Sequence, residues 1–153
     1  MGRLLSIHIA PAAGAGLASV DAVKALPGRG LEGDRYCLGA GSFSGNPGTG
    51  RECTLIEMEA IRALEGELGL AIEAGEARRN LVTEGVALNH LVGREFSIGA
   101  VRLRGMRLCE PCKGLAALTG KPAILPGLIH RGGLRCEILS EGELRVGDPI
   151  RIA

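Results

Sequence analysis

Two cysteines, separated by two residues, stand in the stretch CEPCKGL, residues 109 to 115. This spacing can supply half of a zinc site, a redox dithiol, or one reactive thiolate beside an unrelated thiol. The other cysteines and the histidines are isolated, so zinc would require assembly from distant segments. A thioredoxin-like dithiol should open a helix within a βαβ unit, and no such pattern surrounds this pair. The residues therefore disfavour both the zinc site and the redox dithiol.

The remaining thiols and imidazoles predict structural roles. Cys53 and Cys136 lie in apolar strand patterns, where cysteine behaves as a small buried hydrophobic residue. His8, His90 and His130 are expected to be structural or surface residues rather than metal ligands.

Two glycine-rich stretches imitate phosphate-binding loops. GRGLEG, residues 28 to 33, has the spacing of a dinucleotide fingerprint, but a glycine-rich segment follows where a helix is required. GNPGTGRE, residues 45 to 52, has Arg51 and Glu52 where a phosphate loop needs lysine and a hydroxyl residue. Neither stretch predicts a nucleotide site.

Four polar clusters, however, stand at the predicted ends of strands. They are Gly33-Asp34-Arg35, Arg78-Arg79-Asn80, Pro111-Cys112-Lys113 and His130-Arg131-Gly132-Gly133. If they converge on one barrel mouth, their arginines form an anion cradle facing a thiolate whose pKa the cations lower. The alternative is that each cluster is a separate solvated turn with local pairing. The residues alone leave both interpretations open.

Composition narrows the class of protein. The chain has 153 residues, of which 46% are hydrophobic and 23% charged, and this predicts one folded domain over residues 1–153. A net charge of +1 and three aromatic residues disfavour nucleic-acid binding. No apolar run approaches the roughly 20 residues of a membrane span, and no secretory signal is evident. Five cysteines, an odd number, predict reduced thiols in a cytoplasmic protein.

The pattern of elements that must position these residues is mostly β. The 25 glycines favour short strands joined by turns over a helical bundle. A principal helix is predicted over residues 57–68 with Gly69 as its C-terminal cap, a short helix over 86–93, and a long loop over 29–51. Alternation over 95–108 changes phase at Gly105, which indicates a bulge. Strands are also predicted over 3–10, 17–26, 53–57, 80–85, 134–140, 143–148 and 149–153, giving a closed or highly curved β-barrel.

Five stretches occur in the same order as in a known family. They are GLEGDRY at 30–36, RRNLVTEGVALNHLVGREFSIGAVRL at 78–103, EPC at 110–112, RGG at 131–133 and EGELRVGD at 141–148. In this order they resemble MOSC domains, the molybdenum cofactor sulfurase C-terminal domains, of the small stand-alone bacterial type. The resemblance implies a barrel-like fold, which agrees with the pattern above.

The resemblance also implies roles for individual residues. It implies binding of the pterin molybdenum cofactor, with Cys112 as the molybdenum ligand and catalytic residue of a reductase of N-hydroxylated compounds. Arg35, Arg79 and Arg131 would hold phosphate and pterin groups, and Asn80 would meet a pterin edge. Gly33, Asp34 and Gly132 complete the implied cofactor-binding set.

The alternative implied by the family is a sulfur carrier without turnover, with a persulfide on Cys112. The expected partner is an electron-donor protein for the reductase or a cysteine desulfurase for the carrier. Tyr36 stands where many relatives have histidine, which weakens any proton-transfer role there. No residues resemble a pyridoxal-phosphate lysine site. Cys109 is an additional thiol that either resolves such a persulfide or is packed.

Overall fold

A computed structural model describes residues 2–10, 18–34, 52–110, 120–121 and 123–152. Its strands are β1 Gly2–Ile9, β2 Ala18–Val20, β3 Ala22–Leu26, β4 Gly30–Leu31, β5 Cys53–Glu57, β6 Leu81–Glu84, β7 Glu95–Ile98, β8 Val101–Leu108, β9 Leu134–Ile138, β10 Gly142–Arg145 and β11 Pro149–Ile152. Its helices are α1 Met58–Leu68 and α3 Ile124–Gly127, with 3₁₀ turns η1 Ala74–Ala77 and η2 Leu88–Leu91.

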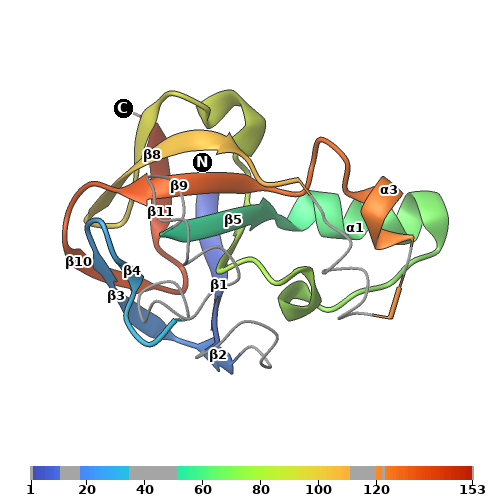
Figure 1. Ribbon diagram of the computed structural model, residues 1–153, viewed down its shortest axis with the longest axis horizontal. Coiled ribbons are helices and arrows are strands. Elements are labelled where there is room, and N and C mark those ends of the chain that lie inside the picture. Colours follow the sequence, from blue (N-terminus) through green and yellow to red (C-terminus); the bar gives the residue numbers. More distant parts are fainter. Residues whose placement is uncertain (1, 11–17, 35–51, 111–119, 122, 153) are drawn as a thin grey trace.

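The main sheet closes on itself. Its order is β11-β7-β8-β9-β5-β6-β1, and β1 pairs with β11 through Gly2–Ile150 and Arg3–Pro149. Among the described strands this makes a seven-stranded barrel, with β2 added at the end of β1 (Figure 1). The predicted β-barrel is therefore confirmed, because the first and last strands complete each other's hydrogen bonding.

One strand pair, β5 with β6, is parallel, whereas the other described pairs are antiparallel. A parallel pair needs a crossover, and α1 and η1 supply it. Both faces of β5 are consequently buried: Leu55 faces the barrel interior, and Ile56 packs under α1 and α3. This explains why CTLIE reads as a continuous apolar run with no alternation.

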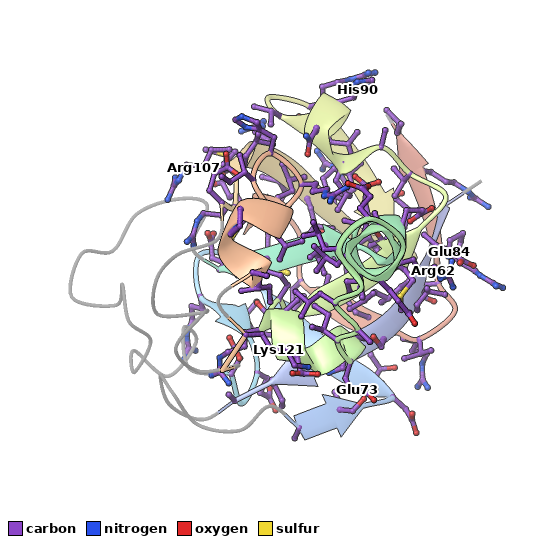
Figure 2. All side chains as sticks on the ribbon, turned by 90° about the vertical axis from the view of Figure 1, so that its right-hand side faces the viewer. Arg62, Glu73, Glu84, His90, Arg107 and Lys121 are labelled. Atoms are coloured by element: carbon purple, nitrogen blue, oxygen red, sulfur yellow. The ribbon has the colours of Figure 1, made fainter. Side chains whose placement is uncertain are left out.

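The helix α1 ends as predicted. Gly69 adopts the left-handed conformation at φ 63°, and its N–H donates to Glu65 O. Ile61 and Leu64 are buried against the barrel, whereas Leu68 in the last turn is 52% exposed. Figure 2 views this side of the molecule and shows Arg62 beside Glu84 on β6, to which its guanidinium lies 3.8 Å away.

The predicted bulge at Gly105 is confirmed. The β8–β9 register shifts between Gly105 and Arg107. A Cβ on Gly105 would lie 2.2 Å from Leu91 O, so only glycine lets η2 pack this closely against β8. The bend re-aims the end of β8, from which Cys109 and Glu110 continue.

Some elements differ from the prediction. Instead of one strand over 17–26, Ala18–Val20 and Ala22–Leu26 form two strands in different sheets: β2 pairs with β1, and β3 pairs with β10 and β4. Within the predicted loop over 29–51, Gly30–Leu31 forms β4, which pairs with β3 in a hairpin. The glycine motif at 28–33 contains β4 and the residues on either side of it. The short helix predicted over 86–93 is the 3₁₀ turn η2, and α3 and η1 were not predicted. In the described part of the chain no helix could cross a membrane.

Candidate functional site

The centre of the candidate site is Asn80, at the start of β6. Its side-chain Oδ1 accepts from Thr54 N at 3.1 Å and from Thr54 Oγ1 at 3.2 Å, and its Nδ2 donates to His8 O at 3.1 Å. Its backbone carbonyl accepts from His8 N at 2.7 Å. Asn80 is fully buried and joins β1 to β5 at this end of the barrel. Its amide thus stabilises the framework from which the site's segments depart.

Asp34 is attached to the same end of the barrel. It is fully buried, and its Oδ1 accepts from Ala10 N at 3.0 Å, two residues beyond His8. Gly33 has φ 85°, a left-handed conformation that glycine adopts freely, and its backbone lies close to the side chain of Ile9. The Gly33-Asp34 turn is therefore fixed against the end of β1, directly before Arg35.

Arg79 is a buried guanidinium that holds three segments together. Its Nε donates to Gly132 O at 2.8 Å, one terminal nitrogen to Ala77 O at 3.3 Å, and the other to Cys109 O at 3.0 Å and Glu110 O at 3.4 Å. The residue is only 8% exposed. Arginine suits this task because its planar fork carries five donors and no acceptor.

Arg131 lies in a different environment. Its terminal nitrogens form a bidentate pair with Glu67 at 2.8 and 3.1 Å, and its Nε donates to Gly127 O at 2.7 Å. Hydrogen bonding and charge from Arg131 lower the pKa of Glu67, and the same pair raises the pKa of Arg131. The charge of Arg131 is thus compensated at the end of α1.

A second pair, Glu110 and His130, is absent from the predicted site residues and lies beside the contacts made by Arg79. Glu110 Oε1 accepts from His130 N at 2.7 Å, and Glu110 Oε2 lies 3.1 Å from His130 Nδ1. Asn89 Nδ2 donates to His130 O at 2.6 Å. His130 has φ 64°, a conformation uncommon outside glycine. The only sequence signal was its position in the HRGG cluster, because contacts between residues 20 and 41 positions apart leave no local pattern.

The three described cysteines are free thiols inside the protein. Cys53 and Cys136 face each other across β5 and β9 and are fully buried. Burial raises the pKa of both thiols well above the ordinary value, and nearby negative charges, including Asp34 for Cys53, raise it further. Cys109 is 2% exposed. The expectation that Cys53 and Cys136 are small buried residues is confirmed.

These contacts join the described parts of three of the four predicted clusters into one continuous series; the fourth, Pro111-Cys112-Lys113, lies outside the described residues. Asp34 binds the end of β1, β1 binds Asn80, and its neighbour Arg79 binds the segments that carry Gly132 and Glu110. Arg131 points away from this series toward α1. Arg35 and Cys112 lie outside the described residues; in the sequence Arg35 follows Asp34, and Cys112 is two positions after Glu110. Among the described residues no group of side chains is arranged to hold a metal ion.

Comparison with known proteins agrees with this architecture. A family model described as the MOSC domain matches residues 41–151. No curated protein matches the chain by sequence. Among solved structures, the YuaD protein of Bacillus subtilis is similar with a TM-score of 0.81 and 18% identity, over 99% of this chain and 96% of that one.

Two further solved structures share the fold. YiiM from Geobacillus stearothermophilus has a TM-score of 0.76 and 17% identity, over 100% of this chain and 75% of that one. YiiM from Escherichia coli has a TM-score of 0.71 and 18% identity, over 99% of this chain and 69% of that one. Because the family model matches well over half of its residues, the chain belongs to the MOSC domain family.

Proposed function

We propose that this MOSC protein binds the pterin molybdenum cofactor and reduces N-hydroxylated compounds, with Cys112 as the molybdenum ligand. The observation that carries the proposal is the Arg79 clamp. Its guanidinium holds the carbonyls of Cys109 and Glu110, so the chain is fixed immediately before Pro111 and Cys112. A thiolate that follows a firmly held stretch of backbone can serve as a metal ligand at small entropic cost.

The charges of the described residues fit an anionic cofactor. In the described part of the chain, Arg79 donates to carbonyl oxygens only, so its positive charge has no carboxylate beside it. A buried cation without a counter-ion attracts an anion strongly, because little water screens it. The phosphate of a pterin cofactor would supply that anion. The charge of Arg131 is already compensated by Glu67, so it contributes less.

Under this proposal, some residues bind the cofactor directly and others hold the segments that carry them. Cys112 would hold the metal through its thiolate, and Arg35 would bind the phosphate or pterin through charge-assisted hydrogen bonds. Arg79, Asn80 and Gly132 would hold the segments that carry these two residues. When bound, the cofactor would supply the two-electron redox chemistry, with the electrons drawn from a separate donor protein.

The proposal is tested by purifying the protein without oxygen from a host that makes molybdenum cofactor. Molybdenum is measured by elemental mass spectrometry, and pterin by fluorescence after oxidative release, in wild type, Cys112→Ser and the control Cys37→Ser. We expect metal and pterin near one equivalent in wild type and in the control, with the metal lost in Cys112→Ser. Absence of both metal and pterin from wild type would end the molybdoenzyme proposal.

A sulfur carrier is the second candidate, and the burial of Cys109 favours it. A resolving thiol must reach the persulfide it attacks, and Cys109 is 2% exposed with its carbonyl bound by Arg79. A persulfide on Cys112 would therefore persist. Incubation with a cysteine desulfurase, followed by mass spectrometry of the Cys112 peptide, should show an added sulfur if the carrier role holds, and none if it does not.

A further inference from the structure

A row of three side chains crosses the outer face of the barrel on β11, β7 and β8. Arg151 is the register partner of Ser97, and Ser97 is the register partner of Arg102. Residues directly opposite each other in antiparallel strands point to the same face of the sheet. Their neighbours along the strands, Phe96 and Leu103, are buried in the barrel core, so the row faces outward. Two arginines therefore flank one serine on three adjacent strands.

The row lies in a surface hollow of about 280 Å³, lined by Glu95, Phe96, Ser97, Arg102, Arg151 and Ile152. Serine is short, so it leaves a space between the two long side chains. Their strands, β11 and β8, are separated by β7 and are therefore about 10 Å apart, twice the spacing of neighbouring strands. Ligand pockets begin at roughly 300 Å³, so a hollow of this size suits a small molecule.

Arg102 is held in place through both its backbone and its side chain. Its backbone N–H donates to Ser140 Oγ at 2.8 Å, and its carbonyl accepts from Leu139 N at 2.8 Å. One terminal nitrogen of its guanidinium donates to Glu95 Oε1 at 2.6 Å. Arginine carries five donor protons, so this contact orients the guanidinium without using all of its donors.

The hollow has an excess of positive charge. Its carboxylate, Glu95, is shared, because its other oxygen accepts from Arg104 at 3.1 Å. The hydrogen bonds from Arg102 and Arg104 lower the pKa of Glu95 and keep it ionised. Arg104 also lies 3.9 Å from Glu137 on β9. In the part of the chain that the structure describes, the exposed Arg151 guanidinium has no carboxylate beside it, so the β11 side of the hollow carries an uncompensated cation.

Three donors in a row match a tetrahedral oxyanion. A phosphate group has three strong acceptor oxygens that diverge, so it can accept from both guanidiniums and from the Ser97 hydroxyl at once. A carboxylate has two oxygens in one plane and matches a single arginine fork. Ile152 is 51% exposed and lines the same hollow, so it offers an apolar contact to a group joined to the phosphate.

We propose that this row is a binding site for a small phosphate monoester, with Arg102 and Arg151 on the phosphate and Ser97 between them. The site is separate from the proposed cofactor site. Arg102 lies near the start of β8, whereas the contact of Arg79 with Cys109 lies beyond the end of that strand, roughly 20 Å of chain away. The inference therefore does not depend on the proposed function.

Titration of the nitrogen-15-labelled protein with phenyl phosphate, followed by NMR, locates the binding. We expect the side-chain Nε–H signals of Arg102 and Arg151 and the amide signal of Ser97 to shift. No shift at these positions would overturn the proposal. Shifts confined to the residues around Arg79 would place the phosphate at the cofactor site and would overturn it as well.

Three variants test the residues of the row. The affinity for phenyl phosphate should fall roughly tenfold in Arg151→Gln, as for loss of a charged hydrogen bond, and by a smaller factor in Ser97→Ala. Arg145→Gln is the matched control, because it alters an exposed arginine of β10 that pairs with Glu143 at 2.6 Å. This control should bind as wild type does. An Arg151→Gln protein with wild-type affinity refutes the assignment.

The choice of anion and the pH test the ligand class. A phosphate monoester gains its second charge at about pH 6, whereas arginine stays protonated and Glu95 stays ionised. The affinity for phenyl phosphate should therefore rise from about pH 5 to about pH 7, and that for benzoate should stay low and nearly constant. Benzoate that binds as tightly as phenyl phosphate would overturn the phosphate assignment. Inorganic phosphate lacks the apolar group and should bind more weakly, and equal affinity for it would overturn the monoester assignment.

Discussion

Replacing Arg79 by methionine should destabilise the fold strongly. The substitution removes donors from the carbonyls of Gly132, Cys109 and Ala77, at 2.8, 3.0 and 3.3 Å, and weakens the longer contact to Glu110. A buried acceptor left without its donor costs about 1–3 kcal/mol. Loss of the buried charge returns part of that cost, because its desolvation is relieved. We therefore expect the free energy of unfolding to fall by about 3–5 kcal/mol, a large share of the 5–15 kcal/mol typical of a domain.

Arg131→Met is the matched control, because it removes the same side chain from the ion pair with Glu67 and from a single carbonyl, that of Gly127. Glu67 is more than half exposed, so solvent screens the pair and can replace its hydrogen bonds. The urea midpoint of this variant should therefore fall much less than that of Arg79→Met. Both curves should keep the wild-type slope if each variant remains two-state.

Urea unfolding followed by circular dichroism measures both variants. Arg79→Lys adds a third point, since lysine keeps the charge but cannot bridge the same set of carbonyls, and it should fall between wild type and Arg79→Met. A loss below about 1 kcal/mol in Arg79→Met would refute the reasoning, because the carbonyls would then have found other donors at little cost.

Three further predictions follow from buried groups. Gly133→Ala should cost about 3 kcal/mol or more in a urea titration, because its Cβ would lie 1.9 Å from a main-chain oxygen of β5, whereas Gly147→Ala, with comparable φ and open space, should cost only about 1–2 kcal/mol. Burial lowers the pKa of His8 below the ordinary histidine value of about 6.5, so near and below pH 6.5 the unfolded chain binds more protons than the folded protein. The free energy of unfolding should therefore fall as the pH drops from 6.5, and His8→Gln should reduce that fall. Because burial raises the pKa of the Cys53 and Cys136 thiols, iodoacetamide at pH 7.5 should modify them in urea but not in the native protein, as peptide mass spectrometry would show.

Local sequence pattern was sufficient for much of the fold. The 3.6-residue period and Gly69 predicted α1 and its end, and the change of phase at Gly105 predicted the bulge. These features depend on backbone conformation and on neighbours within a few residues, so a short window of sequence contains them. The same window is insufficient for η1, α3 and the two-residue β4, which are too short to show a period.

The sequence also identified the polar clusters, but it could not decide what each member contacts. Arg79 and Arg131 have the same side chain and similar glycine- or arginine-rich surroundings in the sequence. One is enclosed by carbonyls of three segments, and the other pairs with a carboxylate on α1. His130 was expected to be structural or at the surface, and only the fold brings Glu110 to both its backbone and its ring.

What the sequence by itself determined was the class of fold, the family resemblance and the residue types able to do chemistry, because these follow from composition, periodicity and order along the chain. What only the tertiary structure decided was which donors are already satisfied and which side chains fix one another. The bulge in β8 and closure of the barrel by β1 and β11 place residues dozens of positions apart within hydrogen-bonding distance. The charge state and orientation of a group depend on those distances, which local pattern does not contain.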